Sequence, residues 1–459
     1  MKKIFLLLVI LLCINSANAY QIVYPAKKSV TINSPSSFFI GHTDENETLK
    51  INGQIVKTND LGYFAHTVKL NSGENTFVII GRDNKDEYKI NVPENIENQN
   101  PAQYTKYDEL KYGYVISNNT PLRSTPVNYG INRLTHLQKG VNVFLSGEYS
   151  GFYKVFLSND EFGWIDKNSV KLTDDEDRDF STVFDYRKCE DKNFDTYEFY
   201  LMKKVPYKIE ENPFKLTIFN LKNSTGSFSI KPHILDRLIG YKSYYEGDKL
   251  VLKIRKFPKI GTIKPLDKIT VVVDAGHGGS EAGAIGCSGA KEKDINLIIA
   301  KYLQKELKHL GANVILTRED DNYLGLYDRV KITNDNDAQI FVSIHANATI
   351  DSKNPNEHSG TSVYYYYEQA KPLAENILAS VNKIAETNND GIHQESFAVV
   401  RNTQALSVLV ETAYMINPDD IAKLEQPYFQ RKIAKGIAHG ILNYFKPPSE
   451  DKKAEGEDD

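Results

Sequence analysis

The sequence is poor in cysteine and has no excess of either charge. Only 3 of its 459 residues are cysteine, which is too few for a scaffold held together by disulfides. The 56 Lys and Arg nearly balance the 60 Asp and Glu, so the chain lacks the basic excess of a nucleic-acid-binding protein, and we expect no nucleic-acid partner. A hydrophobic content of 41% excludes wholesale disorder. At roughly 100 to 200 residues per domain, the length predicts two to four domains.

Long apolar stretches are missing beyond the start of the chain. Two lysines precede an apolar run from Ile4 to Ile14, and Ala17 and Ala19 supply the small residues that a signal peptidase reads. The run is shorter than the ~20 apolar residues that span a membrane. We therefore predict a cleavable signal peptide over 1–19, an exported protein and no transmembrane segment in the mature chain.

Two cysteines, Cys189 and Cys287, remain after this cleavage. They fall in different predicted domains, and pairing cannot be deduced from sequence alone. We expect two free thiols, with pairing left open.

The region 20–93 consists of short strands separated by turns. Residues 48–51 and 54–57 flank Asn52-Gly53, a dipeptide that tolerates the positive φ of a tight hairpin. The pattern predicts a small β-sandwich and resembles bacterial immunoglobulin-like modules. The polar segment 94–107 has no periodicity and is typical of a linker.

Two further β regions follow the linker. The region 108–172 contains pieces such as Thr120–Pro126 and Gly163–Ile165, which recur in this order in the bacterial SH3-like fold that it resembles. After an acidic hinge, apolar strand runs within 180–262 predict another β-rich domain.

Beyond Pro265, strands alternate with helices. Continuous apolar runs, typical of strands buried on both faces, occur at 269–274, 312–317, 338–345, 361–367 and 407–411. Amphipathic patterns predict helices over 295–310 and 426–444. This alternation predicts an α/β domain over 268–446 with a mostly parallel sheet. The expected fold class is multidomain, with N-terminal all-β modules before this domain and a disordered acidic tail over 447–459.

Residues of catalytic type lie where these strands end. His277 follows the first strand in a glycine-rich loop, His345 ends the third strand and Glu411 ends the fifth, while Glu292 precedes the first helix. In an open α/β sheet these positions meet at one edge and build the binding crevice.

Each of these residues alone has a structural explanation, such as a carboxylate at the positive end of a helix for Glu292. Two histidines and a glutamate, however, are also the ligand set of a catalytic zinc that keeps one position for water. Glu411 follows an apolar run, so it needs either a cation or a raised pKa that serves catalysis. The four residues together favour a metal site.

Several motifs occur in order across this domain: VVVDAGHGG (271–279), Glu292-Lys293, LTR (316–318), FVSIHAN (341–347), SGTSVYYY (359–366) and VLVE (408–411). Through them, the segment from about Lys268 to Phe445 resembles the zinc-dependent N-acetylmuramoyl-L-alanine amidases of the family-3 type. The resemblance implies one zinc ion per chain on His277, Glu292 and His345, and it makes Glu411 the catalytic glutamate. Substrate-binding residues stay unassigned.

The resemblance also implies a peptidoglycan hydrolase. It would cut the amide between the lactyl group of N-acetylmuramic acid and L-alanine of the stem peptide, in cell-wall turnover or daughter-cell separation. We expect a monomer in the periplasm or the external cell wall, and an activator protein is left open. Two alternatives remain: a non-catalytic wall-binding or regulatory protein, and a zinc peptidase acting elsewhere on the stem peptide.

Three arginines, Arg318, Arg329 and Arg401, match positions that are often basic in this family. Ion pairs that hold loops to the sheet explain them at least as well as substrate contact does.

Overall fold

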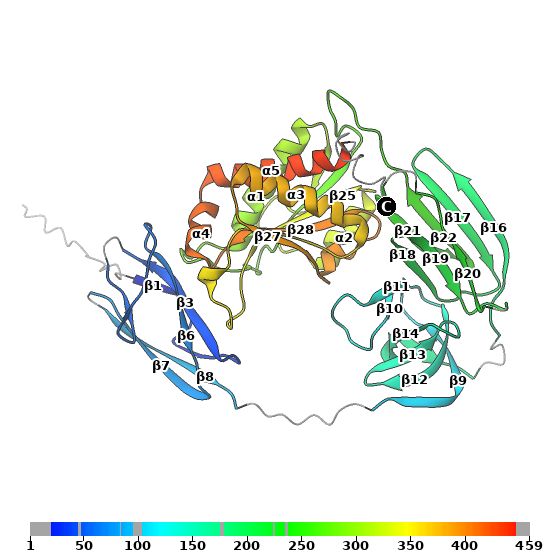
Figure 1. Cartoon of the computed structure of the whole chain (residues 1–459), viewed down its shortest axis with the longest axis horizontal. Coiled ribbons are helices and arrows are strands. Elements are labelled where there is room, and N and C mark those ends of the chain that lie inside the picture. Colours follow the sequence, from blue (N-terminus) through cyan, green and yellow to red (C-terminus); the bar gives the residue numbers. More distant parts are fainter. Residues whose placement is uncertain are drawn as a thin grey trace, which may run out of the picture.

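The computed structural model describes residues 20–44, 47–82, 84–94, 103–174, 179–223, 225–234 and 237–446. The predicted signal peptide, the predicted tail and residues 95–102 of the predicted linker lie outside these ranges. The α/β domain (268–446) lies between the first β unit (20–94) on one side and the second (103–174) and third (179–262) β units on the other (Figure 1). Strand β9 begins at Thr105, so the end of the predicted linker 94–107 belongs to the second β unit.

The first β unit contains two sheets, with strand orders β1-β3-β6 and β2-β8-β7-β4-β5. Asn52 and Gly53, with φ of 47° and 81°, form the predicted turn between β4 and β5. Side chains from both sheets share one core, including Phe39, Phe64 and Ile79. The strands are β1 (Tyr20–Tyr24), β2 (Ser29–Thr31), β3 (Ser36–Thr43), β4 (Lys50–Ile51), β5 (Gln54–Ile55), β6 (Tyr63–Lys69), β7 (Gly73–Ile80) and β8 (Lys85–Val92).

The second and third β units share a single hydrophobic cluster, although the sequence suggests two independent domains. Val143 and Ile165 of the second unit belong to the same cluster as Phe199 and Leu252 of the third. The second unit holds a seven-stranded sheet: β9 (Thr105–Val115), β10 (Thr120–Arg123), β11 (Arg133–Leu137), β12 (Asn142–Tyr149), β13 (Phe152–Phe156), β14 (Phe162–Asp166) and β15 (Val170–Leu172). The third unit holds two sheets. The first sheet contains β16 (Val183–Glu190), β17 (Phe194–Leu201), β21 (Tyr241–Glu246) and β22 (Lys249–Arg255). The second sheet contains β18 (Tyr207–Glu211), β19 (Phe214–Phe219) and β20 (Ser227–Ile230).

The α/β domain is built on a six-stranded sheet of order β24-β23-β25-β28-β26-β27. Its strands are β23 (Thr270–Ala275), β24 (Asn313–Leu316), β25 (Ile340–Asn347), β26 (Thr361–Tyr365), β27 (Asn389–Gln394) and β28 (Leu406–Tyr414). The sheet is mostly parallel, as predicted, but β26 pairs antiparallel with β28, so β26 and β27 run against the other strands.

Helices cover the two faces of this sheet unequally. Helix α1 (Glu292–His309) buries Ile295, Ile299, Leu303 and Leu307, which recur every four residues and therefore lie on one stripe. Together with α3 (Lys371–Ala385) and α5 (Pro427–Phe445) it packs on the face that carries Val271 and Val408. On the opposite face, α2 (Leu326–Asp335) and the short turn Ala398–Val400 pack against a smaller apolar cluster that includes Phe341 and Leu409. Helix α4 (Pro418–Leu424) follows β28.

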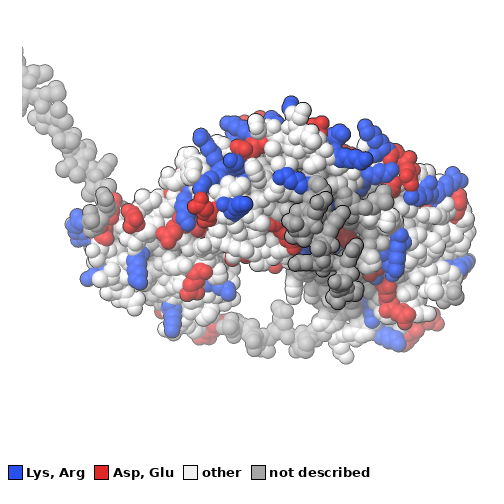
Figure 2. Space-filling model, turned by 45° about the horizontal axis from the view of Figure 1, so that its top comes forward, with Lys and Arg blue, Asp and Glu red and all other residues white. Residues whose placement is uncertain are grey.

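The β units contact the α/β domain through polar and apolar groups. In the first unit, Tyr24 Oη donates to Asp351 at 2.7 Å and Tyr63 Oη donates to Glu425 at 2.9 Å. In the third unit, Glu211 accepts a hydrogen bond from the backbone N–H of Gln369 at 2.8 Å. The exposed Lys and Arg side chains lie scattered over these units with Asp and Glu among them (Figure 2).

Cys189 is exposed and Cys287 is buried, and both are free thiols, as expected. Among the described residues, no helix is both long enough and apolar enough to cross a membrane.

Candidate active site

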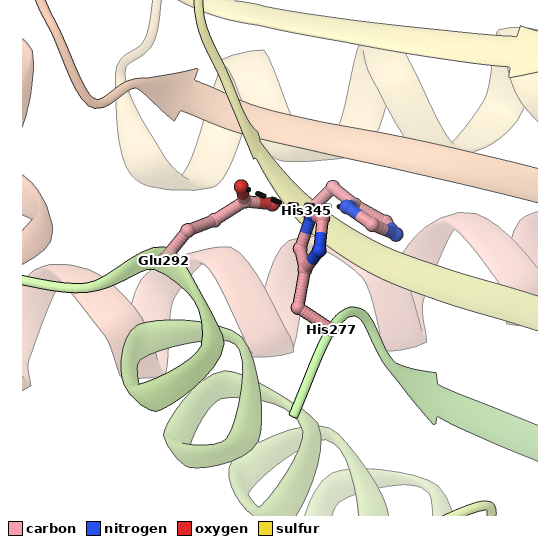
Figure 3. A group of neighbouring side chains, drawn as sticks. All are labelled: His277, Glu292 and His345. Atoms are coloured by element: carbon pink, nitrogen blue, oxygen red, sulfur yellow. Dashed lines mark hydrogen bonds and ion pairs between the residues drawn. The ribbon is translucent and has the colours of Figure 1, made fainter. Parts of the chain in front are cut away.

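Three predicted ligands converge from separate elements of the α/β domain. His277 lies in the loop after β23, Glu292 is the first residue of α1 and His345 lies on β25 (Figure 3). Glu292 Oε2 is 3.1 Å from His277 Nε2, and its Oε1 is 2.9 Å from His345 Nδ1. One ligand atom from each residue can be chosen so that all three lie within 4.8 Å of one another.

Glycines allow this close approach. A Cβ at Gly276 would lie 2.3 Å from the ring of His345, and one at Gly283 would lie 2.3 Å from Glu292 Oε2. Real Cβ contacts are never this short, so a side chain at either position would push a ligand out of place. His277 itself adopts a positive φ of 59°, a strained conformation that tends to occur at functional sites.

Glu292 is held in place by donors on every side. Both carboxylate oxygens accept backbone hydrogen bonds, from Ala284 at 2.8 Å and from Ala346 at 3.2 Å, and Asn296 donates at 3.1 Å. Burial acts to raise the pKa of Glu292, but the hydrogen bonds from the two histidines outweigh it, so this pKa lies well below its usual range. Glu292 is therefore ionised at neutral pH, as a metal ligand must be.

Glu411 lies on β28, directly between two other strands of the site. Its pairing partner on β25 is His345, and its partner on β26 is Ser362. Its Oε2 is buried and has no hydrogen-bond partner among the described residues. Burial raises the pKa of Glu411 to about 7, partly offset by His345. A carboxylate with this pKa can both accept and return a proton near neutral pH.

A buried ion pair supports the loop that carries His277. Asp274, which is fully buried, accepts hydrogen bonds from Arg329 at 2.6 Å, from Thr317 at 2.6 Å and from Ser343 at 2.6 Å. Arg329 also donates to the backbone carbonyl of His277 at 3.0 Å.

Arg318 acts in a similar way on the neighbouring backbone. It donates to the carbonyls of Ala275 at 2.9 Å and Gly276 at 3.0 Å. Arg318 and Arg329 thus hold loops to the sheet. The sequence offered this role for both arginines as one of two explanations, but it did not identify Asp274, a residue of the first motif, as the partner of Arg329.

The donor set fits zinc. It offers two imidazole nitrogens and a carboxylate, which are ligands that zinc accepts, and three protein ligands leave a fourth position for water. Glu411, whose Oε2 has no hydrogen-bond partner among the described residues, is the register partner of the candidate ligand His345. Asn296 and the two backbone N–H groups on Glu292 are the kind of supporting contacts that orient metal ligands.

Fold and site together define an α/β domain with a candidate metal centre of the kind used for hydrolysis. A family model described as N-acetylmuramoyl-L-alanine amidase matches residues 271–443. The chain is 37% identical to YqiI of Bacillus subtilis (strain 168) over 186 residues, which make up 40% of this chain and 87% of YqiI. The chain therefore belongs to the N-acetylmuramoyl-L-alanine amidase family, and its C-terminal domain is an amidase domain.

Two further relatives carry the family's name. The N-acetylmuramoyl-L-alanine amidase LytC of Bacillus subtilis (strain 168) is 38% identical over 181 residues, which make up 39% of this chain but only 36% of LytC. The solved structure of the amidase AmiC2 of Nostoc punctiforme is 38% identical, with 39% of this chain and 98% of AmiC2 covered and a TM-score of 0.37. The family match begins after the three β units.

Proposed function

We propose that the protein is an exported zinc-dependent hydrolase that cleaves the amide between the lactyl group of N-acetylmuramic acid and L-alanine of the peptidoglycan stem peptide. The observation that carries this proposal is the convergence of His277, Glu292 and His345 beside Glu411 within a domain of the amidase family. The bond itself is inferred from the family.

The residues of the chain divide the chemistry between them. His277, Glu292 and His345 would hold one zinc ion, which when bound acts as a Lewis acid and lowers the pKa of water. Glu411 would accept a proton from the attacking water and later donate it to the departing amine of L-alanine. Because Glu411 Oε2 is buried without a hydrogen-bond partner among the described residues, no protein donor there competes with the water for this oxygen.

The three β units would position this domain on the cell wall. We infer an immunoglobulin-like sandwich for the first unit and an SH3-like barrel for the second, supported by their sheets and strand pairing. The signal peptide predicted over 1–19 supports export, either to the periplasm or to the external wall.

Zinc content and product analysis test the proposal. Purified residues 20–459 should contain one zinc per chain and release stem peptides with free L-alanine amino termini from peptidoglycan. His277→Ala should lose both properties. His309→Ala is a matched control, because His309 is an exposed residue of the last turn of α1. New amino termini at another stem-peptide residue would instead indicate a peptidase, and zinc binding without new termini would contradict the proposed activity.

A further inference from the structure

A cavity of about 620 Å³ lies where the second β unit, the third β unit and the amidase domain meet. Its lining includes Arg133 and His136 from β11, Glu211 from β18, and Tyr366 and Arg401 from the amidase domain. This volume is in the range of sites that bind small molecules and peptides. None of the three candidate zinc ligands lines it.

Two arginines of the cavity lining lie close together. Arg133 and Arg401 both donate to Ser396 Oγ, at 2.6 Å and 3.3 Å, so two guanidinium groups meet at one neutral acceptor. Behind them the buried Arg123 donates to Asn132 Oδ1 at 3.0 Å. Within the described ranges, no carboxylate lies within ion-pair distance of these three arginines.

Such an arrangement is unfavourable without an anion. Buried or half-buried charges are normally paired, and each arginine has more N–H donors than the contacts above use. Burial and the nearby arginines lower the pKa of His136 to about 4, so His136 is neutral at pH 7 and can still donate or accept a hydrogen bond. A carboxylate matches the planar fork of an arginine, because it can accept two parallel hydrogen bonds.

The cavity lining also contains the carboxyl group of Glu211. Glu211 Oε2 accepts from the backbone N–H of Gln369 at 2.8 Å, whereas its Oε1 is buried and has no hydrogen-bond partner in the described part of the chain. The lining therefore combines arginine donors with a carboxyl group whose pKa burial raises to about 7, so that Glu211 is partly protonated at neutral pH. The arginine donors are the part of the lining that the carboxylate of a peptide would complement.

Strand β26 links this cavity to the candidate active site. Ser362 pairs with Glu411, and successive side chains of a strand alternate, so Ser362 and Tyr364 lie on the same face. Tyr366, which lines the cavity, directly follows the strand. The hydroxyl of Tyr366 accepts a hydrogen bond from the backbone N–H of Arg133 at 3.1 Å.

We propose that this cavity binds the C-terminal carboxylate of the stem peptide through Arg133 and Arg401. This inference rests on the proposed function, because it assigns a second contact to the same substrate. Substrate selection would then depend on the second β unit, which contributes Arg133 to the site.

Binding of a free stem peptide tests the inference separately from catalysis. The full mature chain would be titrated calorimetrically with the tetrapeptide L-Ala-γ-D-Glu-L-Lys-D-Ala and with the same peptide amidated at its C-terminus. The carboxylate form should bind at least about tenfold more tightly, as expected for charge-assisted hydrogen bonds. Arg133→Gln and Arg401→Gln should each remove this difference.

Two further variants control for lost charge and for misfolding. Arg187→Gln removes one positive charge from an exposed arginine of β16 that does not line the cavity, and it should leave both affinities unchanged. Should Arg133→Gln fail to fold, Arg133→Lys keeps the charge but loses the planar fork, and it should still weaken binding of the carboxylate form.

Equal affinity for the two peptides would overturn the inference. So would a preference for the carboxylate that survives both Arg→Gln variants but disappears in His277→Ala, because the peptide would then bind at the metal site. If the protein prefers the carboxylate form of the tetrapeptide but releases no stem peptides from peptidoglycan, the binding site in the cavity is supported and the proposed activity is refuted. Amidase activity without selective binding would support the activity and refute the cavity.

Discussion

Removal of Arg329 tests whether the buried ion pair with Asp274 holds the active-site loop. Arg329→Met would leave the carboxylate of Asp274 buried without its cation, with only Thr317 and Ser343 as donors. Breaking a buried pair in this way costs about 3–5 kcal/mol. At about 2–4 °C per kcal/mol for a domain of this size, the amidase-domain transition should fall by about 6–20 °C.

The assay is calorimetric unfolding in the presence of a chelator, so that bound metal does not add to the stability. Lys331→Met is the matched control, because Lys331 lies on the same helix, is exposed and pairs with the exposed Asp335. It should change the free energy of unfolding by less than about 0.5 kcal/mol. Adding Asp274→Asn to Arg329→Met removes the stranded charge and should restore part of the loss.

Equal effects of Arg329→Met and Lys331→Met would refute this reasoning. Because Arg329 also donates to the carbonyl of His277, the same variant should bind zinc more weakly once refolded.

Three other substitutions probe the site and its surroundings. Glu411→Gln should retain zinc but lower the turnover number by at least about 100-fold, as measured by stem-peptide release. Gly276→Ala, whose Cβ would lie 2.3 Å from the ring of His345, should weaken zinc binding by at least about tenfold, measured by competition with a chelator. Burial raises the pKa of Glu211 to about 7, above the 4.5 of an exposed glutamate. Between about pH 4.5 and pH 7, the Glu211 carboxyl is therefore protonated in the folded protein but ionised in the unfolded chain. The free energy of unfolding should fall by at most about 3 kcal/mol as the pH rises through this range. Glu211→Gln should flatten that part of the pH profile of unfolding.

Each of these predictions has a contradicting outcome. Near-full activity of Glu411→Gln would remove this residue from the mechanism. Gly151→Ala, where a Cβ meets nothing within 4 Å, should leave zinc affinity unchanged, and an equal loss in both glycine variants would show that the approach to His345 is unimportant. A pH profile that is identical with and without Glu211 would mean that its carboxyl is well solvated.

The amidase domain could be predicted from sequence because its signals are local. Continuous apolar runs mark buried strands without knowledge of their partners, and the predicted runs at 269–274 and 407–411 lie within or next to β23 and β28. The four candidate site residues follow such runs or begin a helix. The parallel-sheet rule was therefore enough to bring His277, Glu292, His345 and Glu411 together.

Other features depend on pairings that no local pattern encodes. An apolar strand has the same composition in either direction, so the reversal of β26 was not predicted. Strand β27 (Asn389–Gln394) has no continuous apolar run and was not predicted at all. The shared core of the second and third β units joins residues such as Leu145 and Phe199 across a polar hinge, which the sequence alone presents as a boundary. The junction cavity combines Arg133, Glu211 and Arg401 from three units, and each of these residues alone resembles an ordinary surface charge.

The packing of the first β unit against the amidase domain has a practical consequence. Phe38, Ile40 and Ala65 of that unit are at most 8% exposed and belong to the same apolar cluster as Leu266 and Ile295. Cutting the chain before residue 268, as is natural when an enzymatic fragment is wanted for fusion to another wall-targeting module, would uncover this surface. Such a fragment is expected to aggregate more readily than the mature protein. Substituting polar residues for the apolar residues exposed by the cut should reduce this aggregation.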